Sequence, residues 1–166
     1  MRVQIPAPEW LRESSLHGRW ALIIQVLSER GWKVVKRGRP YLLPKGLSMA
    51  VHPLRRIRLR PTADTKNPTR DEVALLAHEA CHVLQGGGSR IWWPLRYLLD
   101  PWFRRAVEEE AYAHGVALLL SVGAAWATTD PAVLRPSVYW LRRDLGTADR
   151  VHARARDLVD SARGGA

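Results

Sequence analysis

The sequence predicts an α+β fold that is mainly helical and carries a small N-terminal antiparallel sheet. Apolar residues recur every three or four positions over residues 9–30, 70–86 and 102–126, as they do on one face of a helix. Shorter apolar or alternating segments, bounded by proline and glycine, lie between residues 32 and 60 and indicate strands. With 166 residues, 46% hydrophobic and 25% charged, we expect one globular domain spanning residues 1–166.

The N-terminal third supplies the first helix and the strands of the sheet. Residues 1–8 contain two prolines and are expected to form an extended lead-in. A helix is predicted over residues 9–30, because Trp20, Ile23 and Leu27 share one face and Gly31 follows as a stop signal. Short strands are then expected at three places: residues 32–35, 41–43 and 47–51.

Residues 55–60 read Arg-Arg-Ile-Arg-Leu-Arg and predict one more strand. Ile57 and Leu59 are expected to face one side of the sheet, whereas Arg56, Arg58 and Arg60 face the other. This strand precedes the predicted helix at residues 70–86, from which polar residues 61–69 separate it.

The helix over residues 70–86 has clear signals at both ends. Thr69 followed by Glu72 forms a capping box, in which each side chain accepts a hydrogen bond from the other residue's backbone N–H. Asp71 and Glu72 place negative charge in the first turn, where the helix dipole favours it. Three glycines, residues 86–88, end the periodic segment.

Within this helix lies the sequence His78-Glu79-Ala80-Cys81-His82, an H-E-x-x-H motif. Histidines four residues apart leave the same face of a helix one turn apart, so His78 and His82 can bind one zinc ion. Glu79 stands beside the first histidine and can reach a metal-bound water. Cys81 points away from that face and is expected to be a small packed residue, and a single cysteine excludes an intrachain disulfide.

A catalytic zinc ion needs a third protein ligand, and the residues directly after His82 offer none. The acidic run Glu108-Glu109-Glu110, which begins 26 residues later in the helix predicted over 102–126, is the obvious source. Here the chain resembles the gluzincin group of zinc peptidases, and most of all the minimal ImmA-type enzymes. Their third ligand is a Glu on a second helix, in an E-x-x-A setting. Matching Ala111 to that small residue implies Glu108 as the ligand, with Glu109 as the alternative.

The resemblance implies a zinc-dependent metallopeptidase in which Zn²⁺ is held by His78, His82 and Glu108 and Glu79 is the general base. It also implies a group that stabilises the oxyanion, for which Tyr97, Tyr112 and His114 are candidates. Many gluzincins carry an Asp four residues after the ligand Glu, where it orients a histidine. Tyr112 stands at that position here and either replaces this contact or belongs to the core.

The resemblance also gives a role to the strand before the motif helix, since in zincins an edge strand pairs with the substrate backbone. If residues 55–60 form that edge, their arginines lie near the cleft and select acidic substrates. The alternative is a charged edge that prevents aggregation.

The remaining segments leave alternatives open. Residues 89–101, which include Trp92, Trp93 and Tyr97, form either a short amphipathic helix that acts as a lid or membrane-surface contact, or a cluster packed over the core. A helix is predicted to begin at Pro131 after Asp130, and Pro136 splits it from a segment at 137–145. A final helix is expected over 148–162, followed by a frayed tail at 163–166.

The charge balance is strongly basic, with 26 Lys and Arg against 16 Asp and Glu, a net charge of +10. It favours an acidic or nucleic-acid partner, although the abundance of arginine and alanine is also typical of a high-GC genome. The alternative function is therefore a basic nucleic-acid-binding or virion structural protein that retains a peptidase scaffold. No signal core is present and the longest uncharged apolar run has thirteen residues, so we expect a soluble cytoplasmic protein, virion-associated if phage-encoded.

Overall fold

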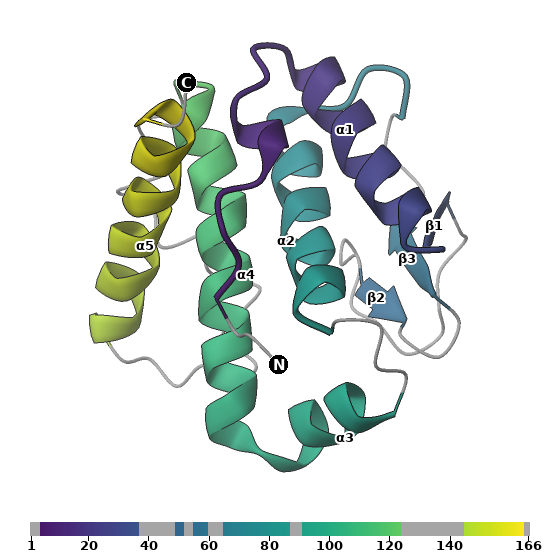
Figure 1. The fold of residues 1–166 in the computed structure, drawn as a ribbon, viewed down its shortest axis with the longest axis vertical. Helices are drawn as coiled ribbons and strands as arrows, with labels where there is room; N and C mark the ends of the chain where they lie inside the picture. The colour runs from purple at the N-terminus through teal and green to yellow at the C-terminus, as the bar shows by residue number, and fades with distance from the viewer. Residues whose placement is uncertain are drawn as a thin grey trace.

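The computed structural model describes residues 4–36, 49–51, 55–59, 65–86, 91–123 and 145–164. Within them the chain is mainly helical with a small sheet, which confirms the predicted composition of the fold (Figure 1). The elements in order are η1 (Glu9–Leu11), α1 (Leu16–Glu29), β1 (Lys33–Lys36), β2 (Met49–Val51), β3 (Arg56–Leu59), α2 (Arg70–Gly86), α3 (Trp92–Leu99), α4 (Pro101–Ser121) and α5 (Leu145–Gly164). No helix in these segments is long and apolar enough to cross a bilayer.

The first predicted helix, residues 9–30, is divided into η1 and α1. Ser15 has an extended backbone, with φ −97° and ψ 145°, and its hydroxyl accepts a hydrogen bond from the Gly18 N–H at 2.9 Å. Ser15 is therefore an N-cap that starts a new helix inside the predicted one. The helix ends at Glu29, one residue before the predicted end, and is followed by Gly31, whose φ of 73° lies in the left-handed region that glycine adopts without strain.

The sheet is mixed, so the prediction of an antiparallel sheet is wrong for one of its two strand pairs. The strand order is β1-β3-β2, with β1 parallel to β3 and β2 antiparallel to it, and Ile57 faces Val34 on one side and Ala50 on the other. Alternation in a sequence fixes which side chains share a face, but it carries no information about the direction of the neighbouring strand. The strand predicted at 41–43 lies outside the described residues.

The position of β3 also corrects the expectation that it is an edge strand. Ile57 and Leu59 are buried, as the alternation predicted. However, β3 lies between the two other described strands, so its arginines do not line an open edge. The strand β2 is an outer strand of the described sheet, and it contacts α2.

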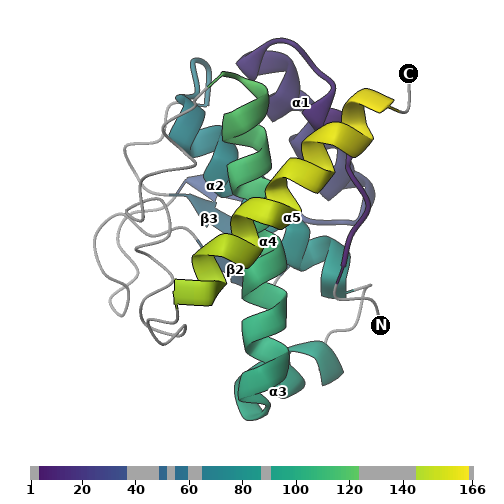
Figure 2. The same ribbon diagram turned by 90° about the vertical axis from the view of Figure 1, so that its left-hand side faces the viewer.

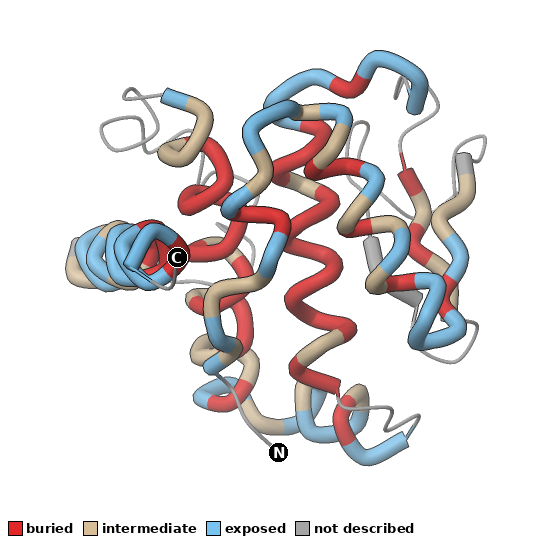
Figure 3. The backbone as a smooth tube through the Cα atoms, turned by 45° about the horizontal axis from the view of Figure 1, so that its top comes forward, coloured by how far each residue is buried: buried red, intermediate tan, exposed pale blue. Residues whose placement is uncertain are grey.

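The helices α5, α4 and α2 lie side by side, and α1 and the sheet cover the other side of α2 (Figures 1 and 2). Buried residues run along nearly the whole of α2, which is the centre of the molecule (Figure 3). The main core is built from apolar side chains of all these elements, among them Trp20, Ile23, Ile57, Leu76, Leu118 and Leu158. Cys81 of α2 is fully buried, as predicted, and burial raises the pKa of its thiol.

A glycine allows the two central helices to approach closely. A Cβ atom added to Gly115 on α4 would lie 3.1 Å from the backbone oxygen of Ala74 on α2 and 3.9 Å from the Cβ of His78. The distance of 3.1 Å to the Ala74 oxygen is shorter than ordinary van der Waals contact. Gly115 therefore sets the spacing between α2 and α4 one turn from the first histidine of the motif.

Both C-terminal helices differ slightly from their predicted bounds. The helix predicted over 102–126 begins at Pro101 and ends at Ser121, after which Gly123 has φ 76°. Asp100 caps it, since its carboxylate accepts a hydrogen bond from the Phe103 N–H at 2.9 Å. The last helix extends beyond 148–162 at both ends. The segments predicted after Asp130 and at 137–145 lie outside the described residues, apart from Leu145 itself.

Candidate metal centre

The predicted capping box fixes the start of the helix that carries the motif. The Thr69 N–H donates to Glu72 Oε2 at 2.9 Å, and the Glu72 N–H donates to Thr69 Oγ1 at 3.3 Å. The helix α2 then runs without interruption to Gly86, as the sequence predicted. His78 and His82 consequently lie one turn apart on a single face, and both are buried.

Glu108 of α4 meets these histidines and completes a triangle of possible ligand atoms. The Nε2 atoms of His78 and His82 are 3.1 Å apart, Glu108 Oε2 lies 3.6 Å from His78 Nε2, and Glu108 Oε1 lies 3.5 Å from His82 Nε2. Zinc bonds of about 2.0–2.1 Å in tetrahedral geometry place ligand atoms about 3.4 Å apart. The three buried side chains therefore fit the spacing that a metal ion requires, and this group could hold one.

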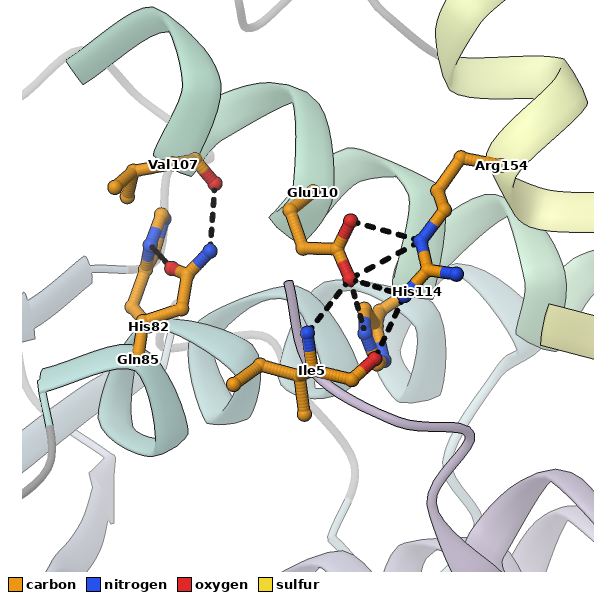
Figure 4. A network of polar contacts seen from close by, with 7 residues as sticks. All are labelled: Ile5, His82, Gln85, Val107, Glu110, His114 and Arg154. Carbon is orange, nitrogen blue, oxygen red and sulfur yellow. Dashed lines mark hydrogen bonds and ion pairs between the residues drawn. The ribbon is translucent and has the colours of Figure 1, made fainter. Parts of the chain in front are cut away.

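Gln85 orients the second histidine through a chain of hydrogen bonds (Figure 4). Its amide nitrogen donates to the backbone oxygen of Val107 at 3.1 Å, and its oxygen lies 3.2 Å from His82 Nδ1. Because a carbonyl can only accept, the amide group of Gln85 must place its oxygen toward His82, whose Nδ1 must carry the proton. The Nε2 atom of His82 is then left with a lone pair aimed at the cluster.

His78 is held as a neutral imidazole by its surroundings. Burial lowers the pKa of His78 well below its ordinary value, and the neighbouring His82 and His114 rings lower it further. The ring of Tyr112 packs against it with centroids 4.4 Å apart. Tyr112 thus supports the His78 ring by contact, while its partly buried side chain also joins the core.

Tyr97 and Glu79 complete the polar surroundings of the cluster. The Tyr97 hydroxyl donates a hydrogen bond to Glu108 Oε1. Burial raises the pKa of Tyr97 above its ordinary value, and the charges of Glu108 and Glu79 raise it further. Glu79 is itself buried. Burial also raises the pKa of Tyr112, and the charges of Glu108 and Glu79 raise it further. The Glu79 carboxylate is therefore close enough to act on both tyrosines, which flank the ligand cluster.

A small second core holds Tyr97 in place. The rings of Trp93 and Tyr97 are stacked, with centroids 5.3 Å apart and planes 17° from parallel. Trp93 packs in turn against Phe103 and Val107. This cluster joins α3 to α4 and includes Val107, the residue before Glu108. Part of the aromatic segment predicted over residues 89–101 is therefore packed against the rest of the molecule, which is one of its two predicted alternatives.

The three neighbouring glutamates of α4 point to different partners. Glu109, the alternative third ligand, pairs with Arg105 at 2.9 Å and with Arg150 of α5 at 2.7 Å. It therefore lies away from the histidines, and only Glu108 joins them. The sequence could not resolve this choice, because successive helix residues point 100° apart and the phase of α4 against α2 is a tertiary property.

Glu110 belongs to a separate buried network that ties both chain ends to α4 (Figure 4). Arg154 of α5 donates from Nη2 to Glu110 Oε1 at 2.8 Å and from Nε to Oε2 at 3.0 Å. The Ile5 N–H donates to Oε1 at 2.9 Å, and Arg154 also donates to the Ile5 oxygen at 2.8 Å. His114, 3.4 Å from Glu110 Oε1, is fully buried in this network. That position removes it from contact with a substrate.

Two features of the site were not predicted from the sequence: the role of Gln85 and the hydrogen bond between Tyr97 and Glu108. Gln85 was missed, although its position three residues after His82 places it on the same side of the helix. Tyr97 was an oxyanion candidate, and its hydrogen bond to Glu108 was not foreseen.

Comparisons of the chain with models of protein families, with curated proteins and with solved structures found no match.

Proposed function

We propose that this protein is a zinc-dependent metallopeptidase that hydrolyses peptide bonds, with a site like that of the gluzincins. One observation carries the proposal. His78, His82 and Glu108 come from two helices and converge so that their donor atoms all lie within 4.8 Å of one another. The H-E-x-x-H motif and the downstream carboxylate are the ligands that the sequence predicts, and a zinc site of this kind requires that they meet.

The donor set suits zinc better than the other common divalent ions. Two imidazole nitrogens and one carboxylate oxygen match catalytic zinc sites, whereas magnesium and calcium prefer oxygen ligands alone. A bound zinc ion supplies Lewis acidity, which polarises the scissile carbonyl and makes a coordinated water more acidic. The neutral state of His78 and the tautomer of His82 both leave nitrogen lone pairs ready for such an ion.

Glu79 is the proposed general base. It follows the first histidine on α2, is buried beside the cluster, and lies near both tyrosines. Its carboxylate accepts a proton from the attacking water and returns it to the leaving amine. Burial among aromatic rings strengthens these electrostatic interactions, since little water remains to screen them.

Tyr97 and Tyr112 are the remaining candidates for stabilising the oxyanion. The pKa of each is raised, so both keep their hydroxyl proton at neutral pH and remain able to donate a hydrogen bond. Tyr97 is the stronger candidate, because its hydroxyl already lies against Glu108 at the centre of the site. A substrate carbonyl that enters the site would compete with Glu108 for this hydroxyl.

The sheet offers a place for the substrate backbone. The strand β2 contacts α2 and is an outer member of the described sheet, so it is the strand that we propose to pair with an extended peptide. Because the arginines belong to β3, they carry no part of this proposal.

The test is hydrolysis by the zinc-loaded wild type and by Glu79→Gln, measured as new amino termini released from a mixture of unfolded proteins. The proposal expects cleavage by the wild type, a loss of at least about a hundredfold in Glu79→Gln, and equal zinc content in both. Equal cleavage by the two proteins would contradict it. A wild type that binds no zinc but binds nucleic acid in a salt-dependent manner would favour the alternative function.

A further inference from the structure

The helix α3 carries apolar side chains on the side that faces away from the rest of the molecule. Trp93 and Tyr97 point inward, to the small second core and the candidate metal centre. Outward-facing residues remain exposed, including Trp92 at 77% and Trp102, in the first turn of α4, at 78%. We call this surface the α3 patch, and its members are Ile91, Trp92, Leu95, Leu98, Leu99 and Trp102.

Helix geometry explains why these residues form one surface. Trp92, Leu95 and Leu99 are three and four residues apart, so they share a face of α3, whereas Trp93 and Tyr97 lie on the opposite face. A helix on the surface of a globular protein usually turns its polar face to water. Here the solvent-facing side is the apolar one, and exposed apolar patches of this kind mark interaction sites.

The charge around the patch points to an anionic partner. Residues 91–105 contain three arginines and one acidic residue, Asp100, a formal net charge of +2. The guanidinium group of Arg96 lies 4.4 Å from the Phe103 ring centroid, and about half of its side chain is exposed beside the patch. Trp102 borders a shallow depression lined also by Arg105, Arg150 and Glu109, and Glu109 pairs with both of these arginines.

We infer that the α3 patch docks on the surface of an anionic lipid bilayer. Tryptophan and leucine on one face of the short helix α3, with the half-exposed Arg96 at the border of that face, match the two layers of a membrane interface. The apolar side chains enter the acyl boundary while Arg96 remains among the headgroup phosphates. The helix lies at one end of the molecule, beyond α5 and the sheet, so a flat surface can reach it (Figures 1 and 2).

Docking would bring the candidate metal centre close to the membrane. Tyr97 and Trp92 belong to the same eight-residue helix, yet one contacts Glu108 and the other faces solvent. The inference itself is independent of the proposed function, because binding of lipid by α3 requires neither zinc nor hydrolysis.

The test is co-sedimentation of the full chain with vesicles of phosphatidylcholine alone or of phosphatidylcholine with phosphatidylglycerol. The comparison protein is the triple variant Trp92→Gln/Leu95→Gln/Leu99→Gln, which leaves every charge unchanged. A matched control, Ala21→Gln/Ala153→Gln, makes the same kind of polar replacement at exposed positions of α1 and α5. Far-ultraviolet circular dichroism verifies that each variant is folded.

We expect the wild type and the control to bind the anionic vesicles and the triple variant to bind at least about tenfold more weakly. We also expect wild-type binding to weaken with added salt and with neutral vesicles. Equal binding by the triple variant would overturn the inference, because the general positive charge would then be sufficient. A wild type that binds no anionic vesicle also overturns it. If this non-binding wild type is a dimer, and the triple substitution dissociates it, the α3 patch is an interface between two copies of the chain.

Discussion

The Nδ1 atom of His82 lies 3.2 Å from the side-chain oxygen of Gln85. This contact decides which nitrogen of His82 faces the candidate metal centre. Since the amide nitrogen of Gln85 donates to the Val107 carbonyl, next to Glu108 in the chain, one side chain links the two helices that supply the ligands. Gln85 therefore orients His82 and fixes its tautomer, as an acidic residue does for a histidine ligand in many zinc sites.

Replacing Gln85 by leucine removes both hydrogen bonds while keeping a side chain of similar size. We expect zinc affinity to fall about 10–100-fold, because the orientation and tautomer of His82 are no longer fixed. Gln85→Glu retains an acceptor for His82 Nδ1 and should bind zinc more tightly than the leucine variant. Competition with a chelator measures both affinities. Equal affinities in the wild type and Gln85→Leu would show that Gln85 does not position the ligand.

Gly115→Val tests the spacing of α2 and α4. The added side chain meets the Ala74 oxygen and the Cβ of His78, so the helices must separate. We expect a loss of about 1–3 kcal/mol in the free energy of unfolding and of at least about tenfold in zinc affinity. Gly164→Val is a suitable control, because a Cβ at that glycine has no neighbour within 4 Å. Unchanged zinc affinity in a folded Gly115→Val protein would refute this role of the glycine.

The ends of the helices that carry the site could largely be predicted from the sequence. The bounds of α2 were predicted correctly because Thr69, Glu72 and the glycines are local signals that act within one turn. Asp100 and Pro101 are a similar local signal, and they explain the start of α4 one residue before its predicted position. The prediction of Glu108 as the third ligand depended on the family resemblance, because spacing alone left Glu109 as an alternative ligand.

Other features depend on contacts between distant parts of the chain. The parallel pairing of β1 with β3, the hydrogen bond from Gln85 to Val107, and the outward direction of Trp92 all depend on tertiary packing. Periodicity identifies the apolar faces of a helix but does not say which neighbour covers them. The inward and outward aromatic residues of α3 could therefore not be separated from the sequence.

The Glu110 network predicts a specific dependence of stability on pH. Burial raises the pKa of Glu110, but the nearby His114 ring, the Arg154 guanidinium and the Ile5 N–H outweigh this effect and lower it from 4.5 to about 2. Between these pH values the unfolded chain binds a proton that the folded chain does not. The stabilisation by Glu110 is therefore complete above pH 4.5 and is lost as the pH falls toward 2.

Urea unfolding at a series of pH values from about 5 to about 3 measures this dependence. Glu110→Gln should lose less stability on acidification than the wild type, although it is less stable at neutral pH. Glu29→Gln, at an exposed position of α1, should follow the wild type. The same pH dependence in Glu110→Gln and the wild type would rule out Glu110 as its source.

The central claim is that His78, His82 and Glu108 bind one zinc ion together. The most direct measurement is the zinc content of the dialysed wild type, Glu108→Ala and Glu109→Ala, with circular dichroism to verify folding. We predict about one zinc per chain in the wild type and in Glu109→Ala, and almost none in Glu108→Ala. A folded Glu108→Ala that retains zinc with unchanged affinity, or a wild type that binds none, would contradict the claim.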